Sequence, residues 1–352
     1  MEDIKLLVEE FTSNSRISKS VSQQIDSKHE EIISKADKNK KAFSYSDFRN
    51  WEAQNDMGLK YPMTFLSKIF LGINSLFLLN NFSSIIKKRF NHFFEYSSML
   101  DDIQVIKSLG GELYLEENPQ NKTPGAGNFP LVEGYSVTKR WLRYLYIFIQ
   151  MKERGIINNN SVWVDIGSYY GGLQGIIKKY FPETKIILVD FNHQLMRSYI
   201  YLKNLYPQSN HILPNQLKKI DSINDLPKGS IVYVEVEDFK LLNKFKVDLV
   251  SNFFSLGEMK EETFKGYLYS SLIKNAKYNY FINRMFSSPF FDKTYDDNLN
   301  ILDYNFSNND AIHFDQFPMG NYQINNRQLH NRTFFRNNSS QYFEVILRNK
   351  LS

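Results

Sequence analysis

Hydrophobic residues in the first third of the chain recur every three to four positions. Ile4, Leu7 and Phe11 show this spacing at the start, and it returns further along the same region. Apolar residues at this interval share one face of a helix. The pattern predicts a helical N-terminal region over residues 1–115 and a second region of different character over residues 116–352.

Beyond residue 160 the pattern changes to short apolar runs that alternate with helical segments. The runs are Val162 to Ile166, Lys185 to Val189, Ile231 to Val236, Val247 to Ser251 and Tyr278 to Ile282. Continuous apolar runs are typical of parallel strands that are covered on both faces. The C-terminal sequence TFFRNNSSQYFEVILRN instead indicates two strands joined by a tight turn. We expect an α/β protein whose mostly parallel sheet ends in an antiparallel hairpin.

Composition narrows the class of protein. The 352 residues are 42% hydrophobic and 15% aromatic, which is enough for a substantial core. The net charge of +5 is small, and the basic residues are dispersed among acidic ones, so nucleic acid is not an expected partner. The absence of cysteine excludes disulfides and thiolate metal sites.

The sequence also bears on the location of the protein. The start, MEDIKLLVEE, lacks the basic segment and apolar run of a secretory signal, so we expect a cytoplasmic protein. The most hydrophobic segment, Met63 to Ile86, is interrupted by Lys68 and several asparagines. A buried helix is favoured there. A weak contact with a membrane surface is the alternative.

The sequence VWVDIGSYYGG predicts a strand followed by a glycine turn, which is where open parallel sheets usually bind ligands. Asp165 precedes Gly167 and Gly171, and Asp190 ends the next apolar run. The glycine spacing differs from G-x-G-x-x-G, and no Walker A lysine follows, so a pyrophosphate is disfavoured. A carboxylate before the glycines attracts a positive ligand group. S-adenosylmethionine (SAM) has a positive end and a ribose that Asp190 can bind.

These motifs resemble those of class I SAM-dependent methyltransferases. VDIGSYYGGLQGI and ILVDF are similar to the first two motifs of that class. VDLVSNFFSLGEM and YFINRM are similar to segments of bacterial sugar O-methyltransferases, whose Asn-x-x-Ser-x-x-Glu-Met pattern falls here on Asn252, Ser255, Glu258 and Met259. The resemblance covers Gly134 to Met285. It implies a Rossmann-like fold with a seven-stranded sheet, SAM as cofactor, and a sugar, nucleotide-sugar or glycan acceptor in polysaccharide biosynthesis.

The resemblance also implies a set of site residues. The expected cofactor contacts are Asp165, Gly167, Ser168, Tyr169, Gly171, Asp190, Phe191, Glu237, Asp238, Asn252 and Phe253. The expected acceptor contacts are Ser255, Asn283 and Arg284. Glu258 is the first candidate base, with a helix-capping or surface role as its alternative. His313 and His330 are further candidates within DAIHFDQFPMGNYQINNRQLHNR, a stretch interpreted as a substrate lid. No carboxylate spacing is diagnostic of a metal, so metal dependence stays open.

Tyr169 departs from the family pattern, which has glycine at this position. A tyrosine makes a positive φ or a close backbone approach costly. We expect either a wider turn whose ring borders the cofactor, or a non-catalytic protein that binds a glycan or another partner. A different acceptor is a further alternative. The sequence SNFF lacks the proline of enzymes that methylate base amino groups, which disfavours a flipped base as acceptor.

Overall fold

The computed structural model describes residues 4–15, 98–120, 131–285, 299–304, 309–320, 328–329, 332–333 and 342–350. The chain forms two compact units, each built from separate segments. Unit 1 consists of Met1–Tyr45, Gln150–Phe317 and Ser340–Ser352, and unit 2 of Ser46–Ile149 and Pro318–Ser339. The division expected between residues 115 and 116 stays a prediction. One division falls within helix α7, Lys139–Glu153.

Unit 1 contains an eight-stranded sheet in the order β5-β6-β4-β3-β7-β8-β12-β9 among the described residues. Its strands are β3 Val162–Ile166, β4 Lys185–Asp190, β5 His211–Ile212, β6 Ile231–Glu235, β7 Leu249–Phe253, β8 Tyr278–Arg284, β9 Asn309–Gln316 and β12 Tyr342–Asn349. The pairs from β5 to β8 are parallel, and β12 is antiparallel to both β8 and β9. The mostly parallel sheet with an antiparallel C-terminal pair is confirmed. The two-residue strand β5 and the strand β9 were not among the expected seven.

The antiparallel pair is built from different residues than the sequence pattern predicted. β9 pairs with one edge of β12, and β8 pairs with its other edge. Because both edges of β12 are occupied, the expected hairpin partner beginning at Thr333 was wrong. The short strand β11, Arg332–Thr333, pairs instead with β10, Gln328–Leu329.

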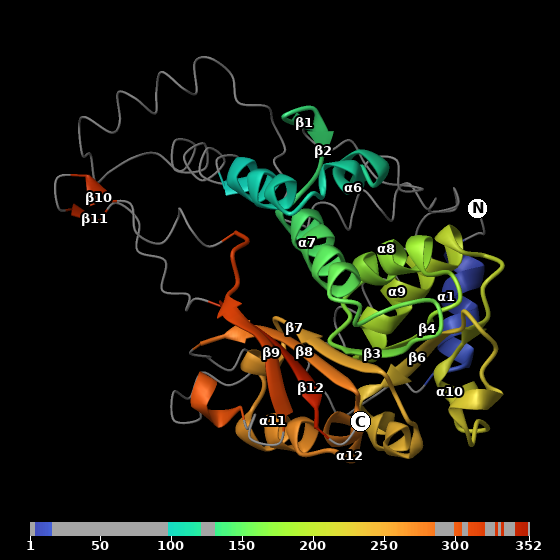
Figure 1. Ribbon diagram of the computed structural model, residues 1–352. Coiled ribbons are helices and arrows are strands. Elements are labelled where there is room, and N and C mark those ends of the chain that lie inside the picture. The colour runs from blue at the N-terminus through green and yellow to red at the C-terminus, as the bar shows by residue number, and fades with distance from the viewer. Residues whose placement is uncertain are drawn as a thin grey trace. The chain divides into compact units, whose positions relative to one another are not determined.

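Helices cover both faces of this sheet (Figure 1). One face carries α1 Ile4–Ser13, α8 Gly172–Tyr180 and α9 Asn192–Leu205, and the other carries α11 Glu261–Leu268 and α12 Ser271–Asn275. Alternate residues of a strand point to opposite faces. Val164 and Val250 accordingly join a buried cluster with Phe264 of α11 and Leu272 of α12. Their neighbours Trp163 and Ser251 face the opposite side, where Trp163 Nε1 donates to Ser251 Oγ at 2.7 Å.

Helix α1 belongs to the same unit as the sheet. The expected apolar face is present, because Ile4, Leu7 and Phe11 are all buried. The ring centroid of Phe11 lies 5.7 Å from that of Tyr199 in α9 and 6.2 Å from that of Tyr233 in β6. The N-terminal helix therefore packs onto α9 and the sheet. Residues 16–97, which include the hydrophobic segment at 63–86, lie outside the described residues.

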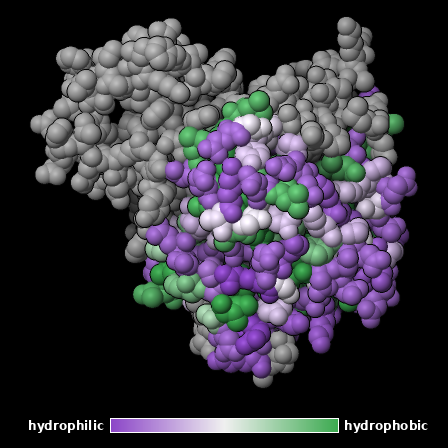
Figure 2. Space-filling model, turned by 45° about the horizontal axis from the view of Figure 1, so that its top comes forward, coloured by the Kyte–Doolittle hydropathy of each residue, from purple (hydrophilic) through white to green (hydrophobic). Residues whose placement is uncertain are grey.

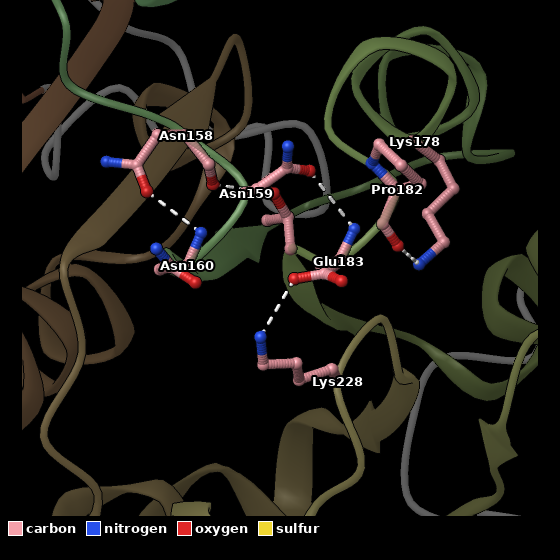
Figure 3. A network of polar contacts seen from close by, with 8 residues as sticks. Asn158, Asn159, Asn160, Lys178, Pro182, Glu183 and Lys228 are labelled. Atoms are coloured by element: carbon pink, nitrogen blue, oxygen red, sulfur yellow. Dashed lines mark hydrogen bonds and ion pairs between the residues drawn. The ribbon is translucent and has the colours of Figure 1, made fainter.

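Polar contacts join the loops at the amino ends of the strands (Figure 3). Lys178 of α8 donates to the carbonyl oxygens of Pro182 and Gly229, which precede β4 and β6. Glu183 forms an ion pair with Lys228 at 2.9 Å, and its backbone N–H donates to Asn159 Oδ1 at 3.2 Å. Hydrogen bonds between side chains and backbone, together with one ion pair, therefore hold the loops together at this end of the sheet.

Unit 2 is described in part. Residues 98–108 form a helix that is followed by α6, Glu112–Glu117, and the short pair β1 Leu131–Val132 and β2 Tyr135–Ser136 precedes α7. Trp141 Nε1 in α7 donates to Asn118 O at 2.6 Å. Burial raises the pKa of Asp102 to about 6, although its Oδ1 accepts from Gly320 N at 2.7 Å.

No helix within the described residues is both long and apolar enough to cross a membrane. On the face drawn in Figure 2, hydrophilic residues predominate and the hydrophobic ones form small separate groups. Small scattered groups of this kind are normal on a protein surface.

Candidate functional site

The candidate site lies at the carboxyl ends of β3 and β7. β3 has β4 on one side and β7 on the other, so the order of strands reverses between β3 and β7. Open parallel sheets bind ligands at such a switch point. The turn from Gly167 to Gly171, which joins β3 to α8, stands at this position.

The turn has three alternate positions with positive φ. Gly167, Tyr169 and Gly171 have φ values of 79°, 55° and 87°. A Cβ atom at Gly167 would lie 2.2 Å from Ser255 Oγ, and one at Gly171 would lie 3.0 Å from Leu202 Cδ1. Gly167 is therefore favoured by both space and φ, and Gly171 mainly by φ. The backbone has the alternation expected of a G-x-G-x-G turn, and Tyr169 occupies the middle position in the left-handed region.

Four contacts hold Tyr169 in this conformation. A left-handed non-glycine residue costs about 1–3 kcal/mol and persists only when its surroundings fix it. Tyr169 N donates to Asp190 Oδ2 at 2.8 Å, and its carbonyl accepts from Ser198 Oγ at 2.5 Å. The guanidinium of Arg197 lies 4.8 Å from the centroid of the Tyr169 ring and donates to its hydroxyl at 3.3 Å. The ring is thus engaged by α9.

Asp190 closes the turn from the end of β4. Its Oδ1 accepts from Phe191 N at 2.8 Å while Oδ2 accepts from Tyr169 N. Burial raises the pKa of the Asp190 carboxyl to about 7, and the two N–H donors and Arg197 act in the opposite direction. A carboxylate has about four acceptor positions, so Asp190 can still accept hydrogen bonds from a ribose.

Asp165 supports the turn through a buried network. Its Oδ1 accepts from Ser251 Oγ at 2.5 Å, and its Oδ2 accepts from Gln174 Nε2 at 2.6 Å. Burial raises the pKa of Asp165 to about 7, and the nearby Asp190 raises it further. Each oxygen already accepts one hydrogen bond, so the carboxyl links β3, β7 and α8. A ligand group attracted to it would be an additional partner.

Two buried polar atoms beside the turn lack a hydrogen-bond partner in the described part of the chain. They are Ser168 Oγ and Gln174 Oε1, whose residues are 4% and 1% exposed. Buried polar atoms are nearly always satisfied in folded proteins, so an orphaned pair calls for a polar ligand or water. Ser168 was expected at the site. Gln174 was missed, although it is the one polar residue within the apolar stretch GLQGII.

Asn252 and Asn283 tie the ends of three strands together. Asn252 Nδ2 donates to Ile166 O at 2.7 Å and to Ser255 Oγ at 2.5 Å, while its Oδ1 accepts from Leu256 N and Asn283 Nδ2. Both asparagines are 0% exposed. Their side chains are therefore used inside the protein, and they position the turn around Ser255.

At the end of β6 the buried acidic residue is Glu235, which was not among the expected cofactor contacts. Glu235 Oε1 accepts from Asn192 Nδ2 at 2.6 Å. Glu237 is exposed, and Asp238 forms an ion pair with Lys218 at 3.8 Å. Glu235 and Asn192 thus occupy the tips of β6 and α9, while a role for Glu237 or Asp238 stays a prediction.

Phe191 and Phe253 were also expected as cofactor contacts. Phe191 precedes α9, and its ring is stacked with that of His193 at 6.1 Å. Phe253, at the end of β7, is 8% exposed and packs against Tyr280 with ring centroids 5.0 Å apart. Phe253 is therefore mainly part of the core.

Glu258 and Arg284 meet beside the carboxyl ends of β7 and β8. Arg284 Nη2 lies 3.3 Å from Glu258 Oε1, and Arg284 Nε donates to the Tyr342 hydroxyl at 3.1 Å. Phe254, with φ 69°, places its ring 5.2 Å from that of Tyr342. The structure brings the predicted pair together and adds two aromatic residues that the sequence did not indicate. We call Phe254, Glu258, Arg284 and Tyr342 the Glu258 cluster.

His313 does not join this cluster. It lies in β9, opposite Ile346 of β12, so the lid interpretation of this part of the chain was wrong. Its Nδ1 accepts from Arg154 Nη2 at 3.0 Å, and its Nε2 lies 3.5 Å from the buried carboxylate of Glu344. Nδ1 therefore contacts a residue that follows α7, and Nε2 faces a carboxylate on the neighbouring strand β12. His330 lies outside the described residues, and within the described ones no three acidic or histidine side chains form a metal site.

No family model matches the chain, and no curated protein matches it. Structural similarity is found with several solved methyltransferases, at low identity.

Magnesium protoporphyrin IX methyltransferase from Synechocystis PCC 6803 with bound SAM is 10% identical over 71% of this chain and 97% of its own, with a TM-score of 0.39. A SAM-dependent methyltransferase from Clostridium acetobutylicum ATCC 824 is 10% identical over 60% of this chain and 92% of its own, with a TM-score of 0.36. TehB from Haemophilus influenzae is 12% identical over 57% of this chain and 62% of its own, with a TM-score of 0.36.

The chain has a Rossmann-like α/β fold with a large, mostly parallel sheet. Since these identities and TM-scores are low, the assignment of the fold rests on the strand order of the chain itself, with antiparallel β12 inserted between β8 and β9. The expected fold class is confirmed at this level.

Proposed function

We propose that this protein binds SAM at the turn between β3 and α8 and transfers its methyl group to a hydroxyl of a sugar or glycan. The observation that carries this proposal is the alternation of positive φ at Gly167, Tyr169 and Gly171, opposite the Asp190 carboxylate. Asp190 suits the ribose hydroxyls. The orphaned Ser168 Oγ and Gln174 Oε1 suit the polar methionine end. When bound, SAM supplies an electrophilic methyl group on a sulfonium.

Methyl transfer to a hydroxyl requires alignment of the acceptor and removal of its proton. The carboxylate of Glu258 is the candidate base, and Arg284 orients it at 3.3 Å. The rings of Phe254 and Tyr342 offer apolar surfaces next to this pair, which suits a sugar ring. The preference for a sugar draws its support from the resemblance of residues 252–259 to sugar O-methyltransferases. We also expect a cytoplasmic location.

Two measurements test the proposal. Calorimetry with S-adenosylhomocysteine (SAH) should show binding of one molecule per chain at sub-millimolar concentration. SAM with a labelled methyl group should then transfer label to nucleotide sugars or glycans and not to RNA or protein. Absence of SAH binding at millimolar ligand would refute the cofactor, and label in RNA or protein would refute the sugar acceptor.

The role of Glu258 is tested with Glu258→Gln. Loss of a general base lowers turnover by about 100-fold or more, while the affinity for SAH should stay within about twofold of the parent because Glu258 lies outside the turn. Equal turnover in the two proteins would exclude Glu258 as the base.

A further inference from the structure

Helix α9 presents two polar residues, Arg197 and Ser198, to Tyr169. Gln194 lies three and four positions before them on the same helix face and contacts both. Arg197 is only 7% exposed, so its guanidinium is largely removed from water. Its Nη1 donates to Gln194 Oε1 at 2.7 Å, and its Nη2 donates to the Tyr169 hydroxyl. A buried guanidinium with these partners is fixed in direction.

The contact between Arg197 and Tyr169 is matched to the backbone of the turn. Glycine at position 169 would adopt φ 55° without strain, whereas tyrosine needs neighbours that hold it there. Arg197 supplies a cation over the ring face and a hydrogen bond to the hydroxyl. Ser198 adds a hydrogen bond to the Tyr169 carbonyl. The Tyr169 ring stands where the family pattern has glycine, and it is the part of the turn that Arg197 of α9 contacts.

The same turn residue determines the position of the ribose-binding carboxylate. Tyr169 N donates to Asp190 Oδ2, so the direction of that N–H fixes the carboxylate plane. The positive charge of Arg197 acts on the pKa of Asp190 less than burial and the hydrogen bonds from Phe191 N and Tyr169 N do. Arg197, Tyr169 and Asp190 are therefore linked in a chain from α9 to the end of β4.

We propose that Arg197 is a positioning residue for cofactor binding: by gripping the ring of Tyr169 it holds the turn in its left-handed conformation and aims Asp190 at the ribose of SAM. This inference rests on the proposed function. Arginine and tyrosine together replace the glycine that other members of the fold use, so the arginine is needed only while the tyrosine is present.

A double-mutant cycle measured with SAH tests this dependence. Arg197→Met keeps the apolar length of the side chain and removes the charge, and we expect it to weaken SAH affinity about tenfold, as loss of a buried cation–π contact with its hydrogen bond would. Tyr169→Gly should leave affinity within about threefold of the parent, because glycine accepts a positive φ. In the Tyr169→Gly background, Arg197→Met should change affinity by less than about twofold.

The controls separate positioning from general packing. Arg154→Met removes another arginine of unit 1 that contacts His313, and it should leave SAH affinity unchanged. Arg197→Lys keeps the charge without the planar fork and should fall between the parent and Arg197→Met. Thermal unfolding shows which variants are folded, and if Arg197→Met is not, Arg197→Lys completes the cycle.

The outcomes distinguish the inference from the proposed function. If the parent protein does not bind SAH, the methyltransferase proposal is refuted and the inference with it. If the parent binds SAH but the arginine substitution has the same effect in the parent and in the Tyr169→Gly background, Arg197 acts only through packing of α9 and the inference is overturned.

Discussion

Two aromatic residues, Tyr169 and Phe254, adopt positive φ at the ends of β3 and β7. Strained backbone of this kind concentrates at functional sites because the fold must fix the residues there. The anomaly at Tyr169 could be predicted from its place in a glycine turn. No such signal in the sequence marked Phe254. None marked Arg197 and Ser198 as partners of Tyr169 either, because periodicity predicts a helix without showing which side chains of other elements its residues contact.

Ser168 offers a test in which stability and binding respond differently. Its Oγ is buried without a partner in the described part of the chain, so Ser168→Ala removes an unsatisfied group. We expect the free energy of unfolding to stay within about 0.5 kcal/mol of the parent or to rise. Affinity for SAH should fall about five- to tenfold if the hydroxyl contacts the cofactor.

A matched control for Ser168 is Ser230, which is also buried but donates to Pro227 O at 2.7 Å at the other end of the sheet. Ser230→Ala should lower the free energy of unfolding by about 1 kcal/mol and leave SAH affinity unchanged. The same affinity loss in both variants, measured by calorimetry, would argue against a cofactor contact by Ser168.

Asp165 should make stability depend on pH. Burial raises its pKa to about 7 in the folded protein, above its ordinary value of 3.8. A group with a raised folded pKa stabilises the fold at low pH, and this contribution is lost as pH rises through about 7. Asp165→Asn does not ionise, and the free Gln174 Oε1 can accept from its amide after the Gln174 side chain turns. The variant should therefore gain stability relative to the parent as pH rises.

The gain of Asp165→Asn between about pH 5 and pH 8 should be about 2–4 kcal/mol, measured by chemical unfolding at each pH. A constant difference between the two proteins over this range would show that the Asp165 carboxyl is not protonated near neutral pH.

At the scale of elements, most of the sheet was predictable because its central strands are buried on both faces and read as continuous apolar runs. The strand β9 was not predicted. Its residues are mostly exposed or half-buried at the sheet edge, so the sequence NDAIHFDQ has no apolar run. Its position beside β12 depends on the long-range pairing of Phe343 with Gln316, which no local pattern contains. The candidate residues at the ends of β3, β4 and β8 could be located from the sequence because they end or follow such runs, and their roles stay predictions.

The contacts of Lys178 predict a stabilising role at the end of the sheet opposite the site. Lys178 is 3% exposed and donates to two backbone carbonyls, and burial lowers its pKa to about 8 (Figure 3). Lys178→Met leaves Pro182 O and Gly229 O without this donor, which costs about 1–3 kcal/mol of unfolding free energy. SAH affinity should not change.

Lys228 in the same network is the control for Lys178. Its ion pair with Glu183 is exposed, with 69% of the Lys228 side chain accessible. Lys228→Met should change the free energy of unfolding by less than about 1 kcal/mol, as exposed ion pairs contribute little. If chemical unfolding shows the same loss of unfolding free energy for both variants, the buried hydrogen bonds of Lys178 contribute no more to stability than the exposed ion pair of Lys228.

At the scale of the whole molecule, the first residues of the chain complete the unit that carries the candidate site. Phe11 is 0% exposed and packs on Tyr199 and Tyr233. Since Tyr199 follows Arg197 and Ser198 in α9, the N-terminal helix supports the same helix that contacts Tyr169.

Phe11→Ala should lower the free energy of unfolding by about 3–4 kcal/mol through the cavity that it leaves. It should also weaken SAH binding if α9 shifts. Leu6→Ala on the same helix, where Leu6 is 62% exposed, should change neither property. Chemical unfolding and SAH calorimetry on both variants provide the test, and a Phe11→Ala protein as stable as the Leu6→Ala protein would show that α1 is an appendage rather than part of the core of unit 1.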